Sequence, residues 1–224
     1  MSPTFEGQYM EHKTVNSNQH ESQQSWRKNL GQSRINLVGA RNQSWWTGIT
    51  PSACPGFNKG GLHALPQVHT TASRSEVKDY FNNGWTLTEL LFSALEGEEA
   101  FYRPPMHGLR HPLVFYYAHP AVLYVNKLRL AGLVDGPVNP EFEALFEVGV
   151  DEMSWDDLSK NEMSWPPIES IKAYRQQVYN IVSSLIDHHP DLGNKKCIIN
   201  QGHALWALFM GFEHERNHIE TSAV

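Results

Sequence analysis

The residues whose type and spacing could most directly do chemistry are two histidines near the end of the chain, His214 and His218. They lie four positions apart, and side chains at that spacing project from one face of a helix with Cβ atoms about 5–6 Å apart. Two neutral imidazoles placed in this way can bind a single metal ion. The chain has 12 histidines among 224 residues, about twice the number that average composition gives. A partly exposed histidine pair without a metal is the plain alternative.

Three kinds of metal site compete for this pair. The pattern His-Glu-x-x-His is the signature of zinc metalloproteases, with the glutamate as general base, but Ile219–Val224 supplies neither the glycine nor the histidine of the extended motif. Glu215 and His218 also match half of a ferritin-like di-iron site. The other half would need a second histidine with glutamate three residues before it, and the sequence contains none. A mononuclear site, with one further histidine from another helix, fits the sequence better.

The third ligand of such a site has four candidates: His107, His111, His119 and His203. If one helix ran through His203 and His214, eleven residues would separate them by ~16 Å, too far for one ion. Gly108 and the prolines around it argue against a helix that would present His107 and His111 together. His119 lies in a predicted helix beside Pro120, where a local distortion can aim it inward. Three imidazoles suit zinc hydrolysis, or iron(II) that binds a substrate and O₂, and spacing alone does not choose between them.

Four amphipathic helices are predicted to position these histidines. The first opens at Ser73 with a capping box to Glu76, and the second spans about Pro112 to Gly132 and should be kinked at Pro120. The third starts at Pro166–Pro167, and the fourth runs from about Asn200 to the end. The predicted core face of the third helix consists of Ile168, Ile171, Tyr174, Val178, Ile181 and Leu185. With no alternating strand pattern, this organisation predicts an all-α, antiparallel four-helix bundle.

The remaining segments predict a polar disordered tail over residues 1–38 and an ordered loop over 39–72, so that the bundle occupies 73–224. There is no signal-peptide pattern and no run near the ~20 apolar residues of a membrane span. A net charge of −6 gives no electrostatic footprint for nucleic acid or anionic membranes. The two cysteines, Cys54 and Cys197, exclude a disulfide scaffold and fit a reducing compartment. We therefore expect a cytoplasmic protein.

Several other side chains could be interpreted as functional, but a structural role is the simpler hypothesis for each of them. Acidic residues between the second and third helices are expected to be solvated, and three tryptophans are expected to anchor packing. Cys54 is interpreted as a small loop residue, because no histidine occupies a partner position. Arg103 and Arg110 are expected to pair at the surface or between domains. The acidic residues are Asp151, Glu152, Asp156 and Asp157, and the tryptophans are Trp45, Trp46 and Trp85.

Eight short blocks of sequence resemble one enzyme family, the 5-histidylcysteine sulfoxide synthases of ovothiol biosynthesis, which are related to the ergothioneine sulfoxide synthases. The resemblance covers roughly Val38 to Val224 and is highly specific, because so many separate blocks contribute. The blocks are Trp45–Gly48 (WWTG), Cys54–Gly56 (CPG), Gly84–Glu89 (GWTLTE), Gly97–Pro105 (GEEAFYRPP), Leu109–Leu113 (LRHPL), His119–Lys127 (HPAVLYVNK), Asp151–Asp157 (DEMSWDD) and Gly211–Arg216 (GFEHER).

The resemblance implies a DinB-like four-helix bundle that binds Fe(2+) through His119, His214 and His218. In the family, a formylglycine-generating-enzyme-like domain follows, and usually a methyltransferase domain after it. The complete enzyme joins the sulfur of cysteine to C5 of histidine with O₂ and yields a sulfoxide. This sequence contains the bundle without the second domain, to which the catalytic tyrosine and most of the amino-acid pocket belong. It also stops within a predicted helix, so we expect a partial product that cannot complete the reaction alone.

Two other hypotheses follow from the same residues. A stand-alone DinB-like bundle could act as a metal-dependent thiol transferase with zinc or nickel, since such bundles resemble this one in their three-histidine site. A catalytically silent interaction domain would instead use the face that the missing domain leaves uncovered. Neither alternative involves nucleic acid or a membrane.

Overall fold

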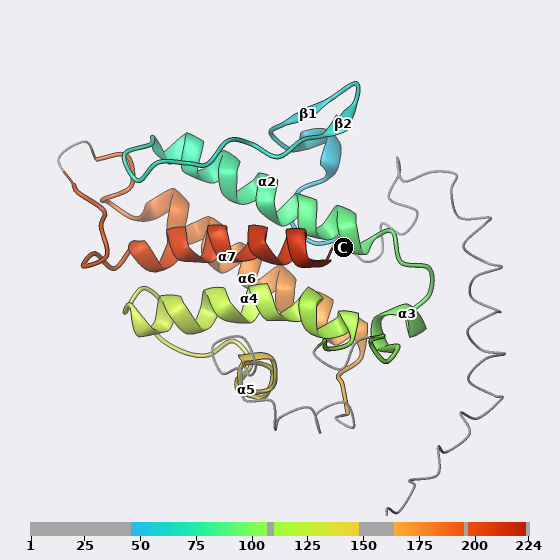
Figure 1. The fold of residues 1–224 in the computed structure, drawn as a ribbon. Helices are drawn as coiled ribbons and strands as arrows, with labels where there is room; N and C mark the ends of the chain where they lie inside the picture. Colours follow the sequence, from blue (N-terminus) through green and yellow to red (C-terminus); the bar gives the residue numbers. More distant parts are fainter. Residues whose placement is uncertain (1–45, 107–109, 148–163, 195–196, 223–224) are drawn as a thin grey trace, which may run out of the picture. The chain divides into compact units, whose positions relative to one another are not determined.

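The computed structural model describes residues 46–106, 110–147, 164–194 and 197–222, all within the compact unit Ala40–Val224 (Figure 1). The described part is all-α apart from one small hairpin. The predicted tail over 1–38 lies outside the described residues, and so do residues 148–163, between the second and third predicted helices. The helices are α2 (Arg74–Phe92), α3 (Glu99–Tyr102), α4 (Leu113–Leu130), α5 (Pro140–Glu147), α6 (Ile168–His188) and α7 (Trp206–Ser222), preceded by the 3₁₀ turn η2 (Pro51–Ala53) and the antiparallel strands β1 (Phe57–Asn58) and β2 (Gly61–Leu62).

The four long helices form a bundle in which α4 packs on α6 and α7, and α2 packs on the same two helices. Figure 1 shows α7 between α2 and α4, with α6 behind them. The predicted antiparallel arrangement holds for α4 with α7 and for α2 with α6. By contrast, α2 runs parallel to α7, since Tyr80 meets Phe212 and Thr88 meets Glu215 further along both helices. None of the described helices is long and apolar enough to cross a membrane.

The start of α2 confirms the predicted capping box. The Ser73 hydroxyl accepts a hydrogen bond from the Glu76 amide at 3.3 Å, and the Glu76 carboxylate accepts one from the Ser73 amide at 2.7 Å. Both bonds satisfy backbone groups that the first turn would otherwise leave without a partner. Trp85 on the same helix is fully buried, which confirms its predicted packing role. Trp45, the first of the predicted tryptophan anchors, lies outside the described residues.

A buried ion pair ties the loop before α2 to three helices. Arg175 of α6 donates from Nε to Glu89 of α2 at 2.9 Å and from Nη1 to the carbonyl of Tyr117 of α4 at 2.7 Å. The same carboxylate accepts hydrogen bonds from the amide and hydroxyl of Thr47. The guanidinium also lies 4.3 Å from the ring centroid of Trp85. A buried charge requires partners of this kind, because removal of one ion leaves the other uncompensated and costs about 3–5 kcal/mol of stability.

Three predictions about helix boundaries and faces need correction. Helix α7 begins at Trp206 instead of Asn200, because side chains in 200–205 bond the backbone locally: the Asn200 side chain accepts from the Gly202 amide and the His203 ring from the Leu205 amide. Late in α6, Val182 and Ile186 are buried in place of the predicted Ile181 and Leu185. After Val178 the buried residues are spaced four apart, at Val182 and Ile186. About 3.6 residues complete a helical turn, so the buried face returns every three or four residues.

The third correction concerns the connection after α4, which contains a helix that the sequence interpretation missed. The Asn139 side chain accepts hydrogen bonds from the amides of Glu141 and Phe142, both at 3.1 Å, and so caps α5. Proline follows at the first helical position, as is common.

Pro120, where the sequence predicts a kink, lies inside α4, and the helix continues through it without interruption.

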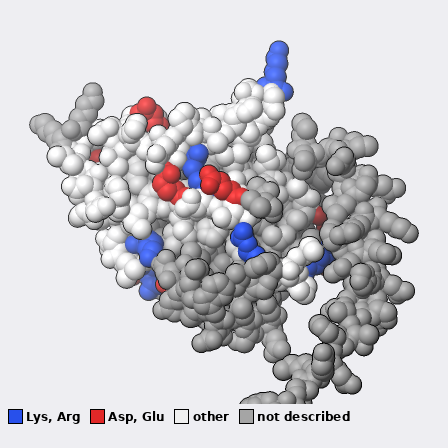
Figure 2. All heavy atoms as spheres, viewed as in Figure 1, with Lys and Arg blue, Asp and Glu red and all other residues white. Residues whose placement is uncertain are grey.

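Figure 2 shows charged side chains scattered over the face seen in Figure 1, with acidic and basic atoms close together near its middle. The described residues on this face therefore present a mixed surface, with no continuous field of one sign.

Candidate metal centre

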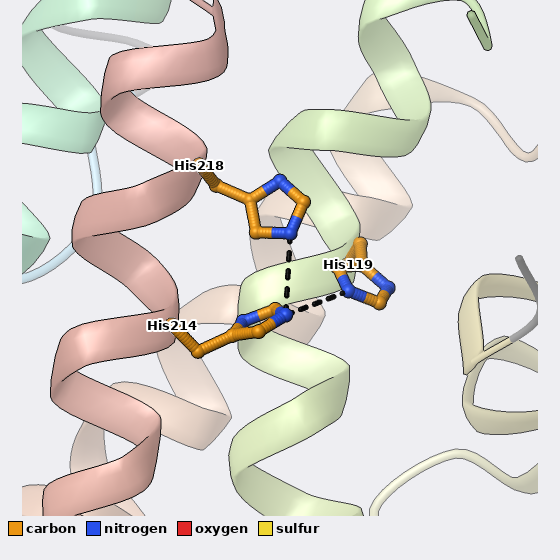
Figure 3. A group of neighbouring side chains, drawn as sticks. All are labelled: His119, His214 and His218. Atoms are coloured by element: carbon orange, nitrogen blue, oxygen red, sulfur yellow. Dashed lines mark hydrogen bonds between the residues drawn. The ribbon is translucent and has the colours of Figure 1, made fainter. Parts of the chain in front are cut away.

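Three imidazoles, one from α4 and two from α7, point toward one another (Figure 3). Nε2 of His214 lies 3.2 Å from Nε2 of His119 and 3.2 Å from Nε2 of His218. The ligand atoms of all three lie within 4.8 Å of one another. An ion with metal–nitrogen bonds of about 2.1 Å would hold neighbouring nitrogens about 3.0–3.4 Å apart at angles of about 90–110°. The spacing of these nitrogens therefore fits a shared divalent ion.

The close approach of α4 and α7 explains how the two helices bring these rings together. Gly211 lies one turn before His214, and a Cβ there would fall inside van der Waals contact of the Tyr124 ring. Because glycine has no side chain, α7 can lie directly against this aromatic residue of α4. The pair Gly211 and Tyr124 thus sets the distance between the helices beside the histidines.

His119 is held in the tautomer that a metal ligand requires. Its side chain is 2% exposed, and its Nδ1 lies 2.6 Å from the carbonyl oxygen of Phe146, near the end of α5. A carbonyl only accepts hydrogen bonds, so Nδ1 must carry a proton, and in the neutral ring Nε2 then carries the lone pair. Metal-binding histidines commonly donate the ring N–H that faces away from the metal to a carbonyl or carboxylate, and this hydrogen bond fixes the orientation of the ring. The missed helix α5 therefore contributes directly to the candidate site.

His214 and His218 are kept neutral by their surroundings. Burial, together with a smaller contribution from the neighbouring His119 ring, lowers the pKa of each imidazole to about 3. A protonated imidazole cannot bind a metal, so a lowered pKa keeps both side chains competent over the physiological range. Among the described residues, neither Nδ1 atom has a hydrogen-bond partner, although both are buried.

A cavity of about 140 Å³ opens beside His119 and His214. Its volume corresponds to a few water molecules or one small solute, at about 30 Å³ for each water. Lys127 and Glu147 contribute one charge of each sign to its wall. The other lining residues are Val122, Leu123, Asn126 and Met210.

Glu215 does not face the histidines, which removes the geometric basis of the protease hypothesis. Its carboxylate is 1% exposed and accepts hydrogen bonds from the hydroxyls of Thr88, at 3.0 Å, and Tyr124, at 3.1 Å. Burial raises its pKa. Adjacent positions on a helix point about 100° apart, so a residue next to His214 is directed into the core between α2 and α4.

Of the other candidate histidines, the two that the structure describes are not part of this cluster. His107 lies outside the described residues. The ring of His111 packs on that of Phe115, with centroids 4.4 Å apart. His203 precedes α7 and lies beside Cys197 and Asp191. Because no single helix joins His203 to His214, their separation along a helix axis cannot be what keeps them apart. His203 nevertheless lies outside the three-histidine cluster.

The remaining residues considered from the sequence have varied outcomes. Cys54 is 4% exposed, and burial raises its pKa, as expected of a small packed loop residue. Arg110 lies over the Tyr116 ring at 5.9 Å, and Arg103 is exposed. The acidic residues Asp151, Glu152, Asp156 and Asp157 lie outside the described part of the chain.

Sequence reasoning missed two contributors to the site, the Phe146 carbonyl and Gly211. The pair Asn139-Pro140, followed by Phe142 and Phe146 four residues apart, is a capped amphipathic turn and could have revealed α5. A glycine inside a predicted apolar helix is a weaker signal of close approach.

The described part is thus an all-α bundle with a cluster of three buried or half-buried imidazoles. No family model matches the sequence. The chain is similar to Ergothioneine biosynthesis protein 1 of Neurospora crassa, with 27% identity over 185 residues that cover 73% of this chain and 19% of that protein. The chain therefore spans about a fifth of the length of this curated relative. The likeness supports a relationship to the ergothioneine biosynthesis proteins.

Proposed function

We propose that this chain forms the iron-binding part of a non-haem iron(II) sulfoxide synthase that joins cysteine sulfur to histidine C5 with O₂, as in ovothiol biosynthesis. The observation that carries the proposal is the convergence of the Nε2 atoms of His119, His214 and His218. The similarity to an ergothioneine biosynthesis protein supports a related chemistry, and the sequence blocks that resemble the 5-histidylcysteine enzymes favour the ovothiol branch.

The donor set suits an ion that must keep positions free. Three imidazoles from two neighbouring helices approach from one side, so the remaining positions of a bound ion stay open for other molecules. When bound, iron(II) supplies a redox-active centre that can take both a sulfur substrate and O₂. The residues that would hold it are His119, through a fixed tautomer, and His214 and His218, as neutral side chains.

The cavity beside the histidines supports an amino-acid substrate. Lys127 can attract a carboxylate and Glu147 an ammonium group, and both line the same cavity as His119 and His214. Opposite charges at fixed positions discriminate zwitterions from simple ions of similar size. We propose that cysteine, histidine or O₂ reaches the ion through this cavity in the complete enzyme.

Anaerobic iron(II) titration of the purified chain tests the proposal. One ion should bind per three-histidine cluster, and His119→Ala, His214→Ala and His218→Ala should each weaken binding by about 100-fold, since one of three ligands is lost. His111→Ala is the matched control, because this imidazole lies just before the start of α4 and outside the cluster. Unchanged iron affinity in all three variants would contradict the proposal.

Affinity alone does not separate this function from that of a zinc- or nickel-dependent thiol transferase. Divalent ions bind a given nitrogen site in the order Fe²⁺ < Co²⁺ < Ni²⁺ < Cu²⁺ > Zn²⁺ whatever the reaction. The decisive measurement is the product that the full-length protein forms from cysteine, histidine and O₂ with each metal. A sulfoxide formed with iron and not with zinc or nickel is the expected result, and thiol transfer with zinc or nickel would overturn it.

A further inference from the structure

A second cluster of potential ligands lies in the connection between α6 and α7, and the proposed function does not use it. Nε2 of His203 lies 3.4 Å from Sγ of Cys197 and 3.4 Å from Oδ2 of Asp191. The three ligand atoms lie within 4.8 Å of one another. We propose that Asp191, Cys197 and His203 form a separate binding site for a divalent cation of the zinc class.

The distances fit such an ion. With zinc–sulfur, zinc–nitrogen and zinc–oxygen bonds of about 2.3, 2.1 and 2.0 Å, tetrahedral angles place sulfur about 3.6 Å and oxygen about 3.3 Å from the nitrogen. Both values lie close to the observed 3.4 Å. A thiolate together with an imidazole selects zinc over calcium or magnesium, which prefer oxygen ligands alone. Since the chain supplies three ligands and all three side chains are partly exposed, water can complete the coordination.

The backbone holds the three side chains in place through buried neighbours. Leu192 follows Asp191 directly, Ile199 comes two residues after Cys197, and Leu205 comes two residues after His203. These apolar residues are 3%, 6% and 0% exposed. Ligands carried on packed backbone need little rearrangement, so less of the binding free energy is lost to ordering.

Metal binding changes the proton on His203. In the structure, the Leu205 amide donates to Nδ1 of this ring at 3.1 Å, so a neutral imidazole carries its proton on Nε2, between the thiol and the carboxylate. A bound cation takes the place of that proton: the imidazole moves its proton to Nδ1, and the thiol releases one proton to solvent. The lost amide hydrogen bond is a small cost beside the free energy gained when a thiolate and an imidazole bind zinc.

Cobalt(II) is the probe that tests this site, because a thiolate ligand gives a sulfur-to-cobalt charge-transfer band and three imidazoles do not. The reduced full chain should show this band, and Cys197→Ser should abolish it. Cys54→Ser, which changes the other cysteine, should leave the band intact, and so should His214→Ala, which removes a ligand of the first site. Zinc should displace the cobalt and bleach the band.

Several results would overturn the proposal: no charge-transfer band in the wild-type chain, a band that survives Cys197→Ser, or a band lost in His214→Ala. Circular dichroism of Cys197→Ser should match the wild type, because the side chain is partly exposed. If that variant does not fold, Asp191→Asn decides: it should weaken cobalt binding at this site by about 10-fold or more, and unchanged binding would contradict the assignment. The cobalt band at this site is independent of iron binding by the three histidines.

Discussion

At the scale of single residues, the protonation of each histidine decides whether the cluster can bind a metal. His119 is fixed by the Phe146 carbonyl, whereas His214 and His218 depend on burial. The two mechanisms differ in their consequences, because a hydrogen bond selects a tautomer while burial penalises the charged form. Burial therefore ties the stability of the metal-free protein to pH.

Metal-free protein should lose stability as the pH falls below about 6.5. The pKa of His214 and of His218 is lowered to about 3 in the fold, so between these two pH values the unfolded chain binds more protons. The free energy of unfolding then falls with decreasing pH, by up to about 1.4 kcal/mol per pH unit for each imidazole. Urea denaturation between about pH 7.5 and pH 4.5 measures this slope. The double variant His214→Ala, His218→Ala should show a shallower dependence, and an identical slope would refute the prediction.

Glu215 provides the residue-scale test of the discarded protease hypothesis. Its carboxylate accepts two buried hydroxyl bonds away from the histidines. Glu215→Gln keeps the volume but presents an NH₂ group to one hydroxyl, so we expect a loss of about 1–3 kcal/mol in unfolding free energy. Iron and zinc affinities should stay within about three-fold of wild type, since no ligand changes. A large drop in metal affinity with intact stability would show that Glu215 acts at the ion.

At the scale of elements, the four long helices could be predicted from caps and periodicity, but the positioning of the site could not. The capping box at Ser73 and the spacing of His214 and His218 are local patterns, which a sequence shows directly. The sequence favours His119 among the four candidates for the third ligand, through its place beside Pro120 and through the family resemblance, but only the packing of α4 on α7 shows its ring beside those of His214 and His218. The partner of His119 is a backbone carbonyl of Phe146, and a backbone atom has no signature in the sequence.

The contact between α4 and α7 should be sensitive to a single methyl group. Gly211→Ala places a Cβ against the Tyr124 ring, which pushes the helices apart beside the histidines. Overpacking of this kind costs about 1–3 kcal/mol of stability, and metal affinity should fall about 10-fold, because His119 moves away from its two partners. Gly84→Ala is the matched control, since a Cβ there meets its nearest atom, Oε2 of Glu215, at 4.0 Å. This control should gain up to about 1 kcal/mol from better helix propensity, and equal effects of both variants would contradict the argument.

At the scale of the whole described unit, the Arg175–Glu89 pair joins α2, α4, α6 and the loop at Thr47 into one structure. The charge on each partner is fully removed from water, so the pair differs from a surface ion pair such as Lys78–Asp187. Surface pairs contribute about 0–1 kcal/mol. Removal of one buried partner leaves the other charge without compensation.

A double-mutant cycle distinguishes a true dependence on this pair from simple loss of packing. Arg175→Met and Glu89→Gln should each lower the unfolding free energy by about 3–5 kcal/mol, because each strands a buried charge, whereas Lys78→Met should cost less than about 1 kcal/mol. The double variant leaves neither charge, so it should be more stable than the sum of the two single losses predicts, by about 1–3 kcal/mol. Urea denaturation of the wild type, the Arg175→Met and Glu89→Gln variants and the double variant gives the coupling energy. Strict additivity would contradict this prediction. It would mean that hydrogen bonds from the hydroxyls of Thr47 and Tyr117 stabilise the Glu89 carboxylate without the guanidinium. The bundle would then be held together by its apolar core.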